Sequence, residues 1–217
     1  MLSRYTPGHK ASPRDAIRNE EEEDDEQCDK QDKGEVADPL AHKFLKTRQI
    51  ILSGEINKPL AERIVRQLLV LEADSDTDPI KIFIDSPGGD ADAGYAIFDM
   101  IRFIKSPVYT IGMGLVASAA SIILLAAPKE RRLGLPNSHY LIHQPLSGIK
   151  GVATEIEIHA AEIEKYRVKI NKLIAAETGL SEEKVSKDTD RDFWMTASEA
   201  KDYNLISKVI VARSEIA

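Results

Sequence analysis

The sequence has little that could form a disulfide bond or a cysteine-based metal site. Its one cysteine, Cys28, lies in an acidic stretch and has no second thiol to pair with. A single thiol excludes an intramolecular disulfide and a cysteine cluster, and it fits a reducing compartment. We therefore expect a cytoplasmic protein that uses no metal and no other cofactor.

The chain also lacks a convincing membrane span. Residues 107–128 carry no charge and are long enough to cross a bilayer. However, the first half of this run is β-like, and Gly112 and Gly114 interrupt it. These features favour a buried strand that ends at Ile111, a turn through the two glycines and a buried helix that begins near Ser118. No membrane association is expected.

An excess of basic residues, which nucleic-acid binding needs, is absent as well. The net charge of −7 arises from seven consecutive acids at residues 20–26, because the other acidic residues equal the 29 Lys and Arg residues in number.

Residues 1–38 hold this block and few apolar side chains, so they cannot bury enough surface to offset the ordering of the chain. We expect a disordered acidic leader, either a removable propeptide or a solvated tail, followed by one folded domain at 39–217.

From Phe44 onward, short apolar runs alternate with helical patterns, which is typical of βα units and a largely parallel sheet. Strands are expected at residues 50–52, 80–84, 108–111, 133–135, 140–142 and 205–211. Asn57 is expected to cap the first long helix, and Thr196 with Glu199 forms a capping box for a short one. The predicted fold class is therefore α/β, with repeated strand-turn-helix units.

A second capping box, Thr154 with Glu157, predicts a long helix that ends near Gly179. Ile156 and Ile170 belong to an apolar stripe along this helix. About 24 residues at 1.5 Å per residue give a length of about 36 Å, so the helix is expected to project from the domain. An apolar stripe on a projecting helix would face water unless another chain covers it, so we expect a protein partner along this helix.

The predicted strand-turn-helix places Ser118 at the start of a helix. Such a turn can present a hydroxyl group, and the free N–H groups of the first helical turn can bind an oxyanion. Ser118 and Ser121 among alanines are, however, more commonly a site of close helix packing. Both interpretations stay open on these residues alone.

A nucleophilic serine needs a base, and only five histidines are present. His143 directly follows an apolar strand, and ligand-facing residues of an open α/β sheet gather beyond the strand ends, so it is preferred over His139. A histidine bonded only to backbone groups is the competing structural interpretation. Spacing alone does not select an orienting carboxylate from Asp188, Asp190 and Asp192.

Six short motifs make the chain recognisable in combination. They are Ser-Pro-Gly-Gly at 86–89, Gly-Leu-Val-Ala-Ser-Ala-Ala at 114–120, Leu-Pro-Asn-Ser at 135–138, Ile-His-Gln-Pro at 142–145, Ala-Thr-Glu-Ile-Glu-Ile at 153–158 and Asp-Arg-Asp-Phe at 190–193. In this order and spacing they resemble the proteolytic subunit of the Clp protease, the ClpP family. The resemblance extends from about residue 44 to residue 211 without a gap.

The resemblance implies a serine endopeptidase in which Ser118 is the nucleophile, His143 the general base and Asp192 the carboxylate that orients the imidazole. It also implies that the N–H groups of Gly89 and Ala119 form the oxyanion hole. The order Ser, His, Asp along the chain is one of several that produce the same catalytic geometry.

The resemblance further implies a ClpP/crotonase-like fold and a homo-oligomer of two stacked seven-membered rings. The long helix and an extendable strand at 144–152 would contact the opposite ring, and Arg191 would link that contact to the site. The implied partners are a hexameric Clp ATPase, which uses the ATP, and unfolded polypeptides. Without the ATPase only short peptides would be cleaved.

Two features depart from the family pattern. The acid-rich leader replaces the usual N-terminal segment, which forms loops around the axial pore. Lys81 and Phe83 stand where the family usually has two alternating aromatics that help to line the pocket for the ATPase. We therefore also consider a subunit that is active mainly in a mixed ring with a second ClpP-like subunit.

A silent scaffold subunit and a crotonase-like acyl-CoA enzyme are competing hypotheses, although the latter usually needs carboxylates in place of Ser118 and His143.

Overall fold

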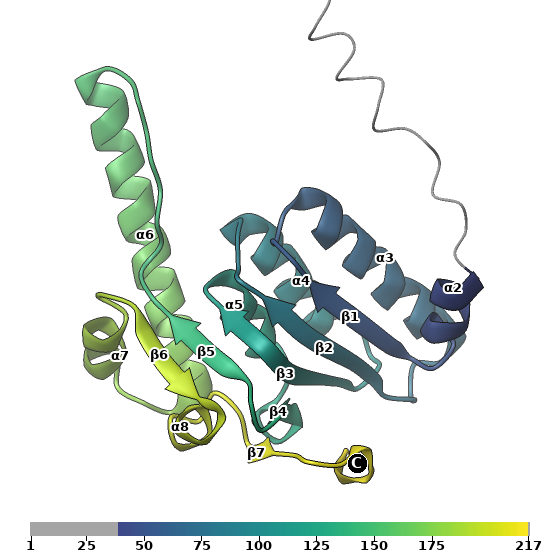
Figure 1. Cartoon of the computed structure of the whole chain (residues 1–217). Helices are drawn as coiled ribbons and strands as arrows, with labels where there is room; N and C mark the ends of the chain where they lie inside the picture. The colour runs from purple at the N-terminus through teal and green to yellow at the C-terminus, as the bar shows by residue number, and fades with distance from the viewer. Residues whose placement is uncertain (1–38, 217) are drawn as a thin grey trace, which may run out of the picture. The chain divides into compact units, whose positions relative to one another are not determined.

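A seven-stranded sheet organises the part of the chain that the structure describes, residues 39–216 of a computed structural model (Figure 1). The path of parallel strands is β1 (Gln49–Ser53), β2 (Ile80–Ser86), β3 (Val108–Ala117), β4 (Arg132–Gly134) and β7 (Lys208–Val209). The strand β5 (His139–Ile142) pairs in parallel with the second half of β3, and β6 (Phe193–Thr196) pairs antiparallel with β5. The predicted α/β class with a largely parallel sheet is confirmed.

The strands all belong to one compact unit that begins at His42. The helices of the described chain are α2 (Pro39–Leu45), α3 (Lys58–Asp74), α4 (Ala91–Phe103), α5 (Ala119–Leu124), α6 (Ala153–Thr178), α7 (Glu182–Asp188) and α8 (Ala197–Asp202). None of the helices within 39–216 is long and apolar enough to span a membrane. The predicted acidic leader, with Cys28, lies outside the described residues.

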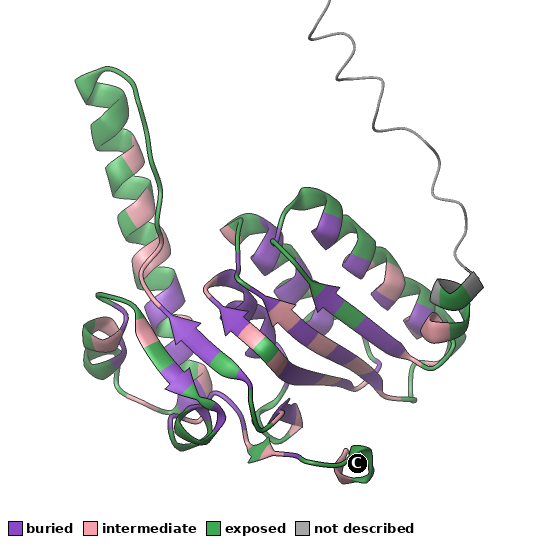
Figure 2. Cartoon of the chain, in the orientation of Figure 1, coloured by how far each residue is buried: buried purple, intermediate pink, exposed green. Residues whose placement is uncertain are grey.

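Alternation along β2 separates the two faces of the sheet. Ile80, Ile82 and Ile84 are fully buried and belong to the same core as the apolar residues of α3 and α4. Lys81 and Phe83 point to the opposite face, because successive side chains of a strand alternate, and both are only partly buried. Figure 2 shows the resulting alternation of buried and intermediate positions along β2.

The expected turn through the glycines after Ile111 is wrong, because β3 continues through them to Ala117. Gly112 lies in the sheet where an added Cβ atom would overlap the hydroxyl group of Tyr140. Gly114 has a φ of +56° in a bulge of the β2–β3 pair, where the N–H of Leu115 donates to the Asp85 carboxylate at 3.0 Å. The glycines therefore permit close packing and a bulge, and the turn occurs later, at Ser118.

The start of α6 also differs from the prediction. The helix begins at Ala153, and the N–H of Val152 donates to the Glu155 carboxylate at 3.2 Å. The N-cap is therefore Val152, two residues before the expected Thr154, and its N–H is satisfied by Glu155. The predicted capping box of Thr154 with Glu157 does not form the start of this helix. The predicted end is confirmed, since Gly179 caps the helix with a φ of 76°.

The long helix α6 is divided into two environments. Its second half carries the buried residues Ile170 and Ile174, whereas Ile156 in the first half is exposed. Figure 1 shows the first half projecting beyond the sheet with the segment after β5 beside it, and Figure 2 shows that this part is mostly exposed. That segment, where the extendable strand was predicted, has no regular secondary structure in the single chain.

The predicted strand at 205–211 is shorter than expected, since only Lys208 and Val209 pair, with the three-residue β4. Leu205 and Ile206 are buried in the turn after α8, where the N–H of Leu205 donates to the carbonyl of Ala200 at 2.9 Å. The apolar run is therefore longer than β7, because the turn that precedes this strand is buried as well.

Candidate active site

Ser118 occupies a sharp turn between β3 and α5. Its backbone has φ 55° and ψ −120°, which is unusual for a residue with a side chain, and its N–H donates to the carbonyl of Leu141 in β5 at 2.9 Å. Strain of this kind costs on the order of 1 to 3 kcal/mol and is concentrated at functional sites. The turn presents the Ser118 side chain to a cavity, as a nucleophile elbow does.

The second serine of the motif is in a different environment. Ser121 is 2% exposed, and its hydroxyl group donates within the core, with the carbonyls of Leu141 at 3.0 Å and Val116 at 3.2 Å as acceptors. Ser121 therefore has a packing role, whereas Ser118 is the serine whose side chain is available to a ligand.

The loop after β2 approaches the turn at Ser118 closely. Gly88 has a φ of +95°, and a Cβ atom added to it would lie 2.6 Å from the Cβ of Ser118. Only glycine fits both the backbone conformation and this contact. The Ser-Pro-Gly-Gly motif thus brings the β2 loop against the serine turn.

Two backbone N–H groups are available beside Ser118. The N–H of Ile56 donates to the carbonyl of Gly88, and the N–H of Asp90 donates to the carbonyl of Ile56, both at 2.8 Å. Because successive N–H groups of an extended segment point in opposite directions, the N–H of Gly89 faces away from Ile56. The N–H of Ala119 belongs to the first residue of α5 and has no acceptor within that helix. Gly89 and Ala119 line the same cavity as Ser118.

The pairing of β5 with β6 brings a histidine and an aspartate together. In this pair Ile142 lies opposite Phe193, so His143 and Asp192 are the next residues beyond it. The Nδ1 atom of His143 lies 3.2 Å from Oδ1 of Asp192, and the two side chains are 12% and 61% exposed. This contact occupies Nδ1 and leaves Nε2 of the imidazole for another partner.

The other candidates from the sequence lie in different surroundings. His139 is exposed at the opposite end of β5 and does not line the cavity. Asp188 accepts hydrogen bonds from Lys184 and from the hydroxyl of Tyr203, both at 2.8 Å, and Asp190 lies 3.4 Å from the guanidinium of Arg167. Among the three clustered aspartates, Asp192 is the one that contacts His143.

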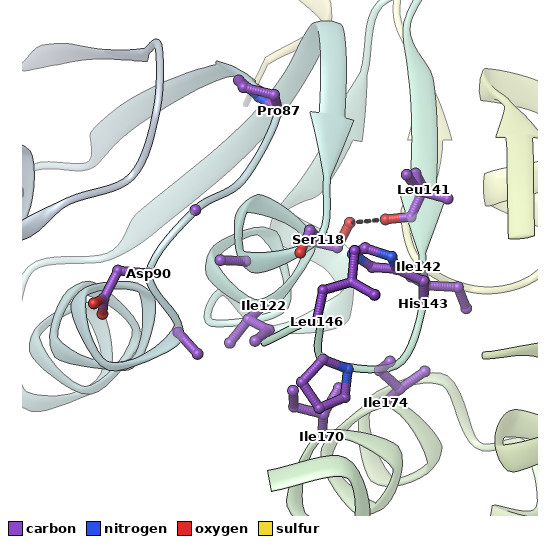
Figure 3. Close-up of a pocket in the computed structure, with 15 residues that line it drawn as sticks. Pro87, Asp90, Ser118, Ile122, Leu141, Ile142, His143, Leu146, Ile170 and Ile174 are labelled. Carbon is purple, nitrogen blue, oxygen red and sulfur yellow. Dashed lines mark hydrogen bonds between the residues drawn. The ribbon is translucent and has the colours of Figure 1, made fainter. Parts of the chain in front are cut away.

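The cavity beside Ser118 has a volume of about 490 Å³ and is mainly apolar. Its apolar lining includes Ile122, Leu146, Ile170 and Ile174, and Figure 3 shows these side chains around Ser118 and the His143 ring. The sequence interpretation did not assign Ile170 and Ile174 to the site. Ile170 was expected on an apolar stripe that contacts a partner, but the spacing along the helix did not reveal that this part of α6 faces the cavity beside Ser118.

Ser118 and His143 line the same cavity, but their side chains are not hydrogen-bonded to each other. Among residues 39–216, no such bond joins the Ser118 hydroxyl to the His143 ring, and contacts of this kind often form only when substrate is bound. Arg191, expected at a ring contact, donates to the carbonyl of Asp190 at 3.1 Å, and its role between rings stays a prediction. The described residues contain no group of three or more His, Cys, Asp or Glu side chains that could hold a metal ion.

These features define an α/β protein in which a serine at a strand-to-helix elbow and a histidine line one mainly apolar cavity, with an aspartate at the Nδ1 atom of the histidine. A family model described as Clp protease matches residues 32–213. The chain is 73% identical over 188 residues to the ATP-dependent Clp protease proteolytic subunit 2 of Treponema denticola, with 87% of this chain and 94% of that protein covered. It is 46% identical over 193 residues to the proteolytic subunit 3 of Rhizobium etli, with 89% and 99% covered.

A solved structure agrees with these relatives. A mutant ClpP1 from Listeria monocytogenes superposes with a TM-score of 0.77 at 50% identity, and the match covers 82% of this chain and 99% of that one. The chain belongs to the Clp protease family. It is a subunit of the proteolytic, ClpP type, and the crotonase-like hypothesis is not favoured.

Proposed function

We propose that the chain is a serine endopeptidase with the triad Ser118, His143 and Asp192. It cleaves short peptides alone and unfolded proteins when an ATPase delivers them. The observation that carries the proposal is the apolar cavity that Ser118 and His143 share, with Asp192 at the other nitrogen of the imidazole.

The proposed reaction begins with attack of the Ser118 oxygen on the peptide carbonyl carbon. His143 accepts the hydroxyl proton through Nε2, and Asp192 stabilises the resulting imidazolium through its contact with Nδ1. The imidazolium then gives this proton to the leaving amine, which releases the first product and leaves an acyl-enzyme. Water, activated by His143, hydrolyses the ester and restores the serine.

The N–H groups of Gly89 and Ala119 are proposed to bind the oxyanion of the tetrahedral intermediate. Both residues line the same cavity as Ser118. Removal of one such donor typically lowers the rate by about 10² to 10³. The proposed chemistry needs no metal and no cofactor in this chain.

The shape of the cavity favours a substrate with an apolar side chain next to the scissile bond. Ile122, Ile170 and Ile174 offer apolar surface, and the volume of about 490 Å³ is ample for one side chain with adjoining backbone. A polar side chain in this place would lose hydrogen bonds to water without replacement.

The test compares hydrolysis of fluorogenic peptides with an apolar or a charged residue before the cleaved bond. Wild type should prefer the apolar peptide, and Ser118→Ala should abolish hydrolysis. Ser214→Ala is the matched control, because Ser214 is exposed and far along the chain from the cavity lining. Hydrolysis that survives in Ser118→Ala would refute the assignment.

The same proposal extends to assembly. The exposed first half of α6, with Ile156 and Ile158 on it, supports a contact between two stacked seven-membered rings. Arg191 directly precedes Asp192, which supports a link between ring contact and the site. The expected location is the cytoplasm, as proposed from the single thiol.

The proposed ATPase partner would dock on the face of β2 that carries Lys81 and Phe83. Phe83 packs against the small cluster of Ile111, Leu133 and Ile210, whereas Lys81 places a charge on the same face. This supports weak docking of the ATPase by the homomer. The alternative proposal is a subunit that is active mainly in a mixed ring with a second ClpP-like subunit. Binding of the ATPase to rings of this chain alone and to mixed rings tests the idea, and equally tight binding to both would contradict it.

A further inference from the structure

Asp192 is too exposed for its own side-chain packing to fix its position. Its side chain is 61% exposed, and the short segment from Thr189 to Asp192 has no regular secondary structure. An orienting carboxylate must nevertheless stay within hydrogen-bond distance of the imidazole, since a displacement of about 1 Å can cost about 10² in rate. Contacts other than those of the Asp192 side chain must therefore hold residues 189–192 in place.

Gln144, the residue that follows His143, makes two hydrogen bonds to this segment. Its backbone N–H donates to the carbonyl of Thr189, and its side-chain amide Nε2 donates to the carbonyl of Asp190, each at 2.6 Å. Gln144 thus joins the strand end that carries His143 to the backbone just before Asp192. In Figure 1 the end of β5 lies beside the start of β6 and near α7.

The far end of the segment is anchored in the core. Thr189 is fully buried, and its hydroxyl group lies 2.8 Å from Oδ1 of Asn171 and 2.9 Å from the carbonyl of Val185. Asn171 belongs to the half of α6 that also lines the cavity through Ile170. Beyond Thr189, two donors meet the carbonyl of Asp190: the side-chain amide of Gln144 at 2.6 Å and the exposed guanidinium of Arg191 at 3.1 Å. Of the two, Gln144 is the one that directly follows His143 along the chain.

We infer that Gln144 is a positioning residue, whose side-chain amide holds the backbone at Asp190 so that Asp192 stays within reach of His143. The inference rests on the proposed function, because it assigns Gln144 to the same Ser-His-Asp site. The amide acts as a hydrogen-bond donor to a carbonyl, and the length of the side chain matters as much as its polarity.

Gln144→Leu removes the donor at nearly constant size, and Gln144→Asn keeps an amide that is one methylene too short to reach Asp190. Both should lower kcat for a short peptide by about 10 to 10² with little change in KM, because the cavity that binds the substrate is unchanged. Gln49→Leu is the control, since Gln49 also donates from its side-chain amide, to Thr47 at 3.0 Å, but lies in β1. The control should keep wild-type kcat.

A double-mutant cycle with Asp192→Ala separates positioning from a general structural role. If Gln144 acts through Asp192, Gln144→Leu should cause no further loss in the Asp192→Ala background, whereas independent effects would multiply. Assembly of every variant is measured by analytical ultracentrifugation, so that rates are compared at equal ring content.

Wild-type kcat in either Gln144 variant, or a full further loss in the Asp192→Ala background, would overturn the inference. Ser118→Ala distinguishes this failure from failure of the proposed function. An inactive Ser118→Ala beside a fully active Gln144→Leu removes only the positioning role, while an active Ser118→Ala removes the serine mechanism itself.

Discussion

Glu177, near the end of α6, is expected to stabilise the fold more than any surface ion pair does. Its carboxylate pairs with the guanidinium of Arg132 in β4, whose side chain is 1% exposed, and also with Arg102 of α4. Burial lowers the pKa of Arg132, and the Glu177 carboxylate raises it. The buried charge of Arg132 therefore depends on this partner.

Removal of one member of a buried ion pair costs about 3 to 5 kcal/mol, because the other charge stays buried without a partner. Arg132 retains two backbone acceptors, the carbonyls of Ala127 at 2.6 Å and of Glu177 at 3.0 Å. We therefore expect Glu177→Ala to lower the free energy of unfolding by about 3 kcal/mol, the lower end of that range. This is a large share of the stability of a typical domain.

Glu62→Ala is the matched control. Glu62 pairs with Arg66 on the surface, and the two side chains are 70% and 72% exposed, so its loss should cost at most about 1 kcal/mol. Urea-induced unfolding followed by circular dichroism measures both variants. All samples are kept at one protein concentration, because ring assembly adds concentration-dependent stability. Equal midpoints and slopes for Glu177→Ala and Glu62→Ala would refute the reasoning.

Three further predictions concern single side chains. The hydroxyl of Tyr95 is buried without a hydrogen-bond partner among residues 39–216, so Tyr95→Phe should raise the free energy of unfolding by about 1 kcal/mol, and a decrease in urea unfolding would contradict this. Gly88→Ala adds a Cβ atom 2.6 Å from that of Ser118 at a φ of +95°, so peptide hydrolysis should fall at least about 10-fold while the circular dichroism spectrum is kept; unchanged hydrolysis would count against the elbow geometry. Burial raises the pKa of Tyr140 from 10.0 to about 12. The unfolded chain therefore loses the Tyr140 proton at a lower pH than the folded chain does. The contribution of this proton to the free energy of unfolding is fully present below pH 10 and is lost by about 1.4 kcal/mol per pH unit as the pH rises toward 12. Tyr140→Phe should reduce this slope in urea unfolding measured at several pH values.

Features set by neighbouring residues could be predicted from the sequence. Asn57 caps α3 by accepting from the N–H of Leu60 at 2.9 Å, as expected from an Asn before Pro59. Thr196 and Glu199 form the predicted capping box, with the carboxylate 2.8 Å from the N–H of Thr196. In each case both partners of the hydrogen bond lie three positions apart along the chain, so the local sequence is enough to predict the interaction.

Features set by distant residues could not be predicted in this way. Gly112 suggested a turn, but its lack of a side chain serves contact with Tyr140, 28 positions away along the chain. The choice of Asp192 over Asp188 depends on the register of β5 and β6, which spacing along one segment does not contain. The family resemblance implies the choice of Asp192, and the catalytic roles stay predictions.

The most direct test of the proposed mechanism asks whether Ser118 is an activated nucleophile. Purified protein is incubated with a fluorophosphonate, and the intact mass is measured for wild type, Ser118→Ala and Ser214→Ala. The mechanism predicts one adduct on wild type and on Ser214→Ala, and none on Ser118→Ala. An assembled wild-type ring without an adduct, or an adduct that persists in Ser118→Ala, would contradict it.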